Sequence, residues 1–110
     1  MTFDEYQKQA PSTLVRHPDP LMNKTILAMG VAGEAGEVIE KWKKIVAYKG
    51  GVVSDEDRTE LGKELADVVW YIAVLAQELG LSFDGIMQEN QKKLESRKAR
   101  NVLKGAGDNR

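Results

Sequence analysis

Residues 65–76 read LADVVWYIAVLA, a segment that is apolar on nearly every side of a helix and carries one charge, at Asp67. Apolar residues continue on both sides at spacings of three and four, from Leu61 to Leu79, which is the repeat of an α-helix. A helix that is apolar all round is normally surrounded by protein. The remaining helices of so short a chain cannot surround it, so we expect part of this surface to pack against a second copy of the chain.

Capping residues, prolines and glycines divide the rest of the chain into helices with readable ends. No segment shows the alternation of a half-buried strand, so the sequence predicts an all-α fold of the four-helix-bundle type, in an oligomer. The expected helices are a short one capped by Thr2 and ended by Pro11, one from Asp19 and Pro20 to about Tyr48, one from Ser54 to Leu79, and one from Ser82 to about Leu103. We expect residues 104–110, which contain two glycines, to form a non-helical tail.

The composition limits the kinds of protein that this chain can be. Its 110 residues suffice for one domain, spanning 1–110, and the absence of cysteine excludes disulfides and thiolate metal sites. A single histidine, His17, excludes a multi-histidine metal site within one chain. Sixteen basic and seventeen acidic residues leave a net charge of −1, which favours neither nucleic acid nor anionic lipid as a partner. Because the sequence begins without a signal-peptide pattern and lacks an apolar run of about 20 residues, we expect a cytoplasmic protein that does not enter membranes.

Two pairs of acidic residues mark the candidate site. Glu34 and Glu37 lie three residues apart on the predicted second helix, and Glu64 and Asp67 repeat the spacing on the third. Residues three apart share one helix face, so antiparallel packing of the two helices would bring the four carboxylates together. An unpaired carboxylate among apolar residues is costly, and Mg²⁺ or Mn²⁺ bound by carboxylate oxygens would relieve the repulsion. The sequence therefore predicts a divalent-metal site.

The same pattern has a plainer interpretation. A single Glu-x-x-Glu pair is common on solvated helices, so the alternative is a non-catalytic helical dimerisation module whose acids are structural or bind an ion. Three glycines at positions 30, 33 and 36 indicate close approach of a neighbouring helix or a ligand, because each costs about 1 kcal/mol within a helix. Without a Glu-x-x-His motif, the chain lacks the ligands of a ferritin-like di-iron bundle.

The sequence around the two acid pairs resembles the MazG-like all-α nucleoside triphosphate pyrophosphohydrolases, in particular a small single-domain branch. The resemblance rests on EAGE at 34–37 followed by ELAD at 64–67, which is similar to the family's ExxE, spacer and ExxD signature. It extends from about residue 20 to the tail. Asn90, Lys93 and Arg97 on the predicted fourth helix resemble the family's Asn-xx-Lys-xxx-Arg segment.

The resemblance implies hydrolysis of a ribo- or deoxyribonucleoside triphosphate between the α and β phosphates, to a nucleoside monophosphate and pyrophosphate. It further implies that the four acids hold Mg²⁺, or Mn²⁺, and carry the catalysis. Asn90, Lys93 and Arg97 would bind phosphates; the alternative is a solvated basic helix, because residues 92–110 carry seven basic and two acidic side chains. Within the enzyme class, the alternative is a pyrophosphatase for a specialised or damaged nucleotide.

The resemblance also points to dimers or pairs of dimers, in agreement with the apolar third helix. We expect a homodimer or homotetramer with an interface built by the second and third helices. Several hundred Å² of apolar surface, at about 25 cal/mol per Å², is ample to drive such association. Ligands of one site could then come from different chains, with Lys93 or residues 108–110 as the candidates to cross.

Overall fold

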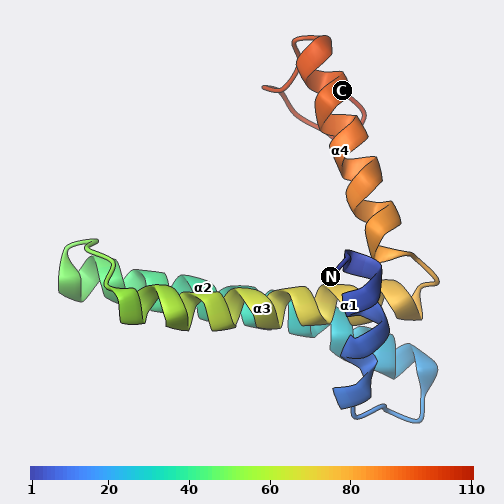
Figure 1. Cartoon of the computed structure of the whole chain (residues 1–110), viewed down its shortest axis with the longest axis horizontal. Coiled ribbons are helices and arrows are strands. Elements are labelled where there is room, and N and C mark those ends of the chain that lie inside the picture. The colour runs from blue at the N-terminus through green and yellow to red at the C-terminus, as the bar shows by residue number, and fades with distance from the viewer.

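The computed structural model describes residues 1–110 and consists of helices joined by short connections (Figure 1). The prediction of an all-α fold is confirmed. The helices are α1 (Phe3–Gln9), the short 3₁₀ helix η1 (Ala10–Thr13), α2 (Pro20–Lys49), α3 (Asp55–Glu78) and α4 (Phe83–Ala99). No single helix is both long and apolar enough to cross a membrane; α3 and α4 have that length and composition only as a pair, and a bend of 104° separates them.

Local side-chain hydrogen bonds determine where the helices begin. Thr2 and Ser54 each form a capping box: the hydroxyl accepts the N–H of the third helical residue, whose carboxylate accepts the backbone N–H of the cap. Asp19 and Ser82 cap α2 and α4 with a single side-chain bond each. At the far end of α2, Gly50 adopts a φ of +60°, a left-handed conformation that glycine reaches without strain, and the helix ends there.

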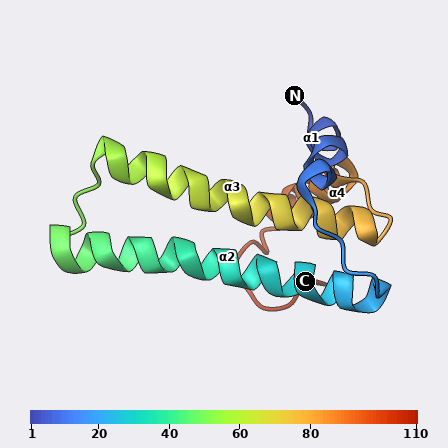
Figure 2. The same cartoon turned by 90° about the horizontal axis from the view of Figure 1, so that it is seen from below.

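Helices α2 and α3 form a long antiparallel hairpin, which is the main body of the molecule (Figure 1, Figure 2). The two helices approach closely at Gly30, where a Cβ would lie 2.2 Å from the ring of Tyr71. Glycine at this position lets the Tyr71 ring rest directly on the α2 backbone. The predicted close approach is thus confirmed for Gly30, whereas a Cβ built on Gly33 or Gly36 would meet no side chain and no other segment of the chain within 4 Å, apart from its immediate neighbours.

Helix α1 packs against the C-terminal part of α3 and ties it to the start of α4. The Gln7 side chain is buried and donates hydrogen bonds to the carbonyl oxygens of Ala73 and Leu81, at 3.1 and 2.9 Å. Its own side-chain oxygen accepts the backbone N–H of Phe83 at 3.1 Å. Because a buried polar group is costly to leave unpaired, these bonds fix the direction in which α4 leaves the hairpin.

Helix α4 leaves the hairpin as a separate arm, and the chain turns back at its end (Figure 1). The sequence predicts a helix to about Leu103, but α4 ends at Ala99, because Asn101 adopts a φ of +58° and the chain reverses. The reversed segment folds around Arg110. The Arg110 guanidinium donates hydrogen bonds to the carbonyl oxygens of Val102, Leu103 and Gly107.

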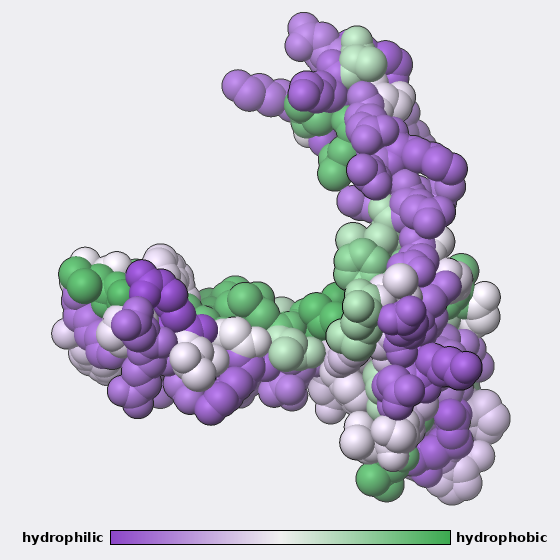
Figure 3. Space-filling view, viewed as in Figure 1, coloured by the Kyte–Doolittle hydropathy of each residue, from purple (hydrophilic) through white to green (hydrophobic).

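A single chain leaves most of its surface open to solvent. Only 10 of the 110 residues are buried, and Leu27 and Val74 are the large side chains that are fully covered. The accessible surface is 7971 Å², whereas a compact monomer of this mass exposes about 6,000 Å². The radius of gyration is 16.9 Å, against about 13 Å for a compact chain of this length. In Figure 3, apolar residues gather on the sides of the hairpin and the arm that face the hollow between them, so one chain alone does not close into a bundle.

Candidate metal centre

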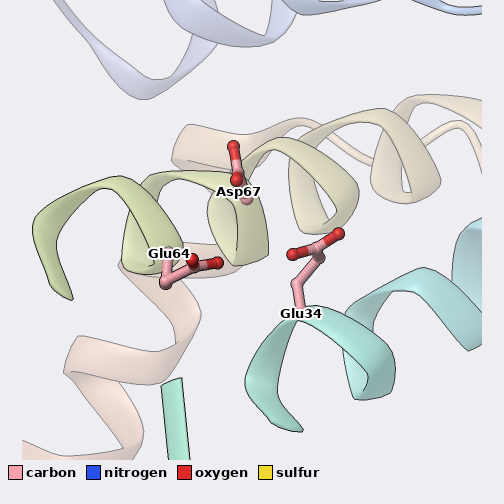
Figure 4. A group of neighbouring side chains, drawn as sticks. All are labelled: Glu34, Glu64 and Asp67. Carbon is pink, nitrogen blue, oxygen red and sulfur yellow. The ribbon is translucent and has the colours of Figure 1, made fainter. Parts of the chain in front are cut away.

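Three carboxylates meet along the hairpin. Glu34 projects from α2, and Glu64 and Asp67 project from α3, with one oxygen of each within 4.8 Å of the others (Figure 4). The antiparallel arrangement of the two helices and the three-residue spacing on α3 produce this convergence. A set of carboxylate oxygens suits a hard cation such as Mg²⁺, which takes one or two carboxylates and keeps several waters. The residues present therefore fit a divalent cation.

Two of the four predicted ligands, Glu37 and Asp67, do not have the surroundings that the sequence predicts. Glu37 is exposed on α2, one turn beyond Glu34, and is not part of the group of three. Asp67 belongs to the group but is exposed, although its apolar neighbours predict burial. The neighbouring Leu65 and Val69 are also exposed, because the chain covers this face of α3 only in part.

The carboxylates of the centre repel one another, and this repulsion changes the pKa of Glu34. Loss of hydration raises the pKa of Glu34 above its usual value, and among its neighbours the charge of Asp67 raises that pKa most. Lys41 is the cation in contact with the group: its Nζ lies 3.0 Å from Glu64 and 3.2 Å from Glu60. The hydrogen bond to Glu64 raises the pKa of Lys41. One ammonium shared between two carboxylates leaves the other acids uncompensated, and a bound divalent cation would relieve that repulsion.

An apolar pocket of about 540 Å³ lies beside the centre, between α1, α3 and the start of α4. Tyr6 lines it, and burial together with the charge of Asp67 raises the pKa of the Tyr6 hydroxyl. Sequence reasoning does not find Tyr6, because its proximity to Asp67 depends on how α1 packs on α3. The other residues of the pocket wall are Met1, Thr2, Phe3, Leu65, Ala66, Val69 and Asp84.

The predicted phosphate-binding residues lie on α4, apart from the carboxylates of the same chain (Figure 1). Lys93 Nζ donates to the Asp108 carboxylate at 3.1 Å, and Arg97 donates to the Asp108 backbone oxygen at 2.7 Å. Arg97 is only 4% exposed, since the tail folds over it, while Asn90 is exposed one turn before Lys93. The structure therefore brings Lys93 and Arg97 together, but around Asp108. Sequence reasoning does not find the role of Asp108 as the partner of Lys93 and Arg97. The feature that indicates it is that Asp108 is an isolated acidic residue within a basic segment.

Comparison with known proteins gives two matches. Residues 22–102 match the family described as MazG nucleotide pyrophosphohydrolase domain, a span that contains nearly all of α2 and the whole of α3 and α4. The chain is also 43% identical to Gene 37 protein of Mycobacterium phage L5, over an alignment of 115 positions that covers all of both chains. The name of that relative states no activity. No solved structure matches the chain significantly.

Proposed function

The chain belongs to the MazG nucleotide pyrophosphohydrolase family, and from this premise we propose that it hydrolyses a nucleoside triphosphate between the α and β phosphates. The products would be a nucleoside monophosphate and pyrophosphate. The observation that carries the proposal is the convergence of Glu34, Glu64 and Asp67 on the two helices of the hairpin. These carboxylates would hold Mg²⁺ or Mn²⁺, which neutralises the charge that develops on phosphate oxygens during the reaction.

The reaction further requires a group that accepts a proton from water and a cation that binds the phosphate oxygens. Water adds to the α phosphorus, the bond from that phosphorus to the bridging oxygen breaks, and pyrophosphate leaves. One of the four acids would accept the proton of the attacking water, and Glu37, which lies outside the group of three, is our candidate for that role; if Glu37 also holds the cation, one of the other acids would take the proton. Lys41 compensates Glu64 in the free chain. A cation held by Glu64 would free Lys41 to donate to a phosphate oxygen.

The test is pyrophosphate release from a panel of ribo- and deoxyribonucleoside triphosphates, with Mg²⁺, with Mn²⁺ and with EDTA. We expect metal-dependent release that Glu64→Gln abolishes, and we expect ¹⁸O from labelled water in the monophosphate only. Orthophosphate and a diphosphate as products would contradict the proposal. Activity confined to a modified triphosphate would select a specialised or damaged nucleotide as substrate, and metal binding without hydrolysis would select the non-catalytic module.

We also propose that the working form is a homodimer or homotetramer built through α2 and α3. The chain exposes roughly 1,900 Å² more surface than a compact monomer of its mass. That excess is of the order that each subunit of a stable homodimer buries. Large apolar side chains stand exposed on both helices of the hairpin, among them Ile26, Met29, Trp42, Leu65 and Val69.

A further inference from the structure

The apolar pocket between α1, α3 and the start of α4 lies within reach of a nucleotide held at the carboxylate centre. Leu65 and Val69 of its wall lie two residues before and two residues after Asp67, so all three are within about one turn of α3. In Figure 4 the Asp67 side chain points toward the side of α3 on which the ribbon of the N-terminal residues lies. The charge of Asp67 also acts on Tyr6 in the pocket wall. A nucleotide whose phosphates are bound at the centre can therefore place its base in this pocket.

The size and the walls of the pocket suit a nucleobase. Its volume of about 540 Å³ lies within the range of small-molecule sites, roughly 300–1,000 Å³. Phe3 and Tyr6, three residues apart on α1, contribute two aromatic rings to the wall. The flat face of a base stacks on such rings, whereas a phosphate requires cations or hydrogen-bond donors. The pocket therefore fits the base of a nucleotide and not its charged end.

The polar groups of the wall limit which base fits. The Thr2 backbone N–H and hydroxyl are both occupied by the capping box of α1. One carboxylate oxygen of Asp84, Oδ1, accepts the backbone N–H of Phe3 at 3.1 Å. The second oxygen, Oδ2, has no donor within the chain, and Asp84 forms no ion pair. A half-buried acceptor without a donor favours a ligand that supplies an N–H.

Nucleobases differ in what they present to such an acceptor. Adenine and cytosine carry an exocyclic amino group, and a carboxylate accepts a hydrogen bond from such a group. Hypoxanthine and uracil carry a carbonyl oxygen at the same ring position, which would set two acceptors against each other. An unpaired acceptor that loses its water is costly, so the same carboxylate favours the first pair of bases and disfavours the second.

We propose that this pocket binds the base of the substrate, and that Asp84 selects adenine or cytosine by accepting a hydrogen bond from the exocyclic amino group. This inference rests on the proposed function for the reaction at the neighbouring centre. Phe3 and Tyr6 would stack on the base, and Leu65 and Val69 would pack against it from α3. Asp84 determines specificity, while the reacting phosphorus stays at the carboxylate centre.

Binding of nucleoside monophosphates tests the pocket without any hydrolysis. Adenosine and inosine monophosphate form one matched pair, and cytidine and uridine monophosphate form another, since the members of each pair differ at the amino position. We expect calorimetry with Mg²⁺ to show at least about tenfold tighter binding of the amino-bearing member, the size of effect that one hydrogen bond to a charged acceptor produces. This comparison uses the wild-type chain.

The variant Asp84→Asn reverses the group that faces the base. Its amide oxygen can still accept the Phe3 N–H, while its NH₂ group replaces the free acceptor. We expect the preference for the amino-bearing base to disappear or to reverse toward inosine and uridine monophosphate. Asp4→Asn is the matched control: Asp4 accepts the Ser82 hydroxyl and the Asp84 backbone N–H at the same junction of α1 and α4 but is not part of the pocket wall. This control should keep the wild-type preference.

Equal binding of both members of each pair by the wild type would overturn the inference, as would an unchanged preference in Asp84→Asn. Failure of all four monophosphates to bind, the result expected if a side chain of a second copy fills the pocket, would overturn it as well. The preference without cleavage of any triphosphate supports the pocket, and the proposed function alone then fails. Cleavage of adenosine and inosine triphosphate with equal kcat/KM would leave the function standing and overturn the inference.

Discussion

Replacing Gly30 by alanine probes the packing of the hairpin with a single added carbon. A Cβ on residue 30 would lie 2.2, 2.3 and 2.7 Å from three atoms of the Tyr71 ring. Carbon atoms in contact prefer about 3.5–4.0 Å, so the ring or the helix must move by about 1 Å or more. The ring has little freedom to move, because Trp70 packs against it edge-on with 4.9 Å between the ring centroids.

Two effects of opposite sign determine the result. Alanine gains about 1 kcal/mol over glycine in helix propensity. Overpacking in a fitted interior typically costs about 1–3 kcal/mol, and a contact this short belongs at the upper end of that range. We therefore expect Gly30→Ala to lower the free energy of unfolding by about 1–2 kcal/mol. Gly36→Ala is the control within the same helix, and it should hold or raise stability because its Cβ would meet no other segment of the chain within 4 Å.

The assay is equilibrium urea unfolding, followed by circular dichroism at one fixed protein concentration. Four chains form a double-mutant cycle: the wild type, Gly30→Ala, Tyr71→Ala and the double variant. Without the Tyr71 ring the clash disappears, so Gly30→Ala should become neutral or stabilising in that background. Equal destabilisation in both backgrounds, or a Gly30→Ala chain as stable as the wild type, would refute the packing argument.

Three further predictions concern the centre, the start of α3 and the assembly. Asp67→Asn should abolish triphosphate hydrolysis while the chain stays helical, and its melting temperature without Mg²⁺ should hold or rise because one repelling charge is gone; full activity of this variant would contradict the metal site. The hydrogen bond from Lys49, followed by the backbone N–H of Ser54, lowers the pKa of Asp57 to about 2. Because this pKa lies below its value in the unfolded chain, ionised Asp57 stabilises the fold fully above about pH 4, and this stabilisation is lost as the pH falls toward 2. The Asp57→Asn variant should therefore have a lower melting temperature than the wild type at neutral pH. Near pH 2 the two melting temperatures should be the same. Light scattering at micromolar concentration should find no stable folded species of 12.2 kDa, and such a species would argue against the oligomer.

Interactions within one helical turn are already determined by the sequence. The predicted starts of the helices at Thr2, Asp19, Ser54 and Ser82 are confirmed, because each capping side chain bonds to the first turn of its own helix. The end of α2 at Gly50 is as local, since glycine alone takes the left-handed conformation there without strain. The shared face of Glu64 and Asp67 likewise follows from their spacing.

Other features depend on contacts between segments that are distant along the chain. The tail folds over Arg97 because the Asp108 backbone oxygen, eleven residues further along the chain, accepts a hydrogen bond from that side chain. Glu34 and Glu37 belong to the same Glu-x-x-Glu motif on α2. The register of the hairpin groups Glu34, and not Glu37, with Glu64 and Asp67. Caps and glycines act over three or four residues, whereas the register of the hairpin and the direction of the arm are set by the packing of whole helices, in which most of the stability of a helix resides.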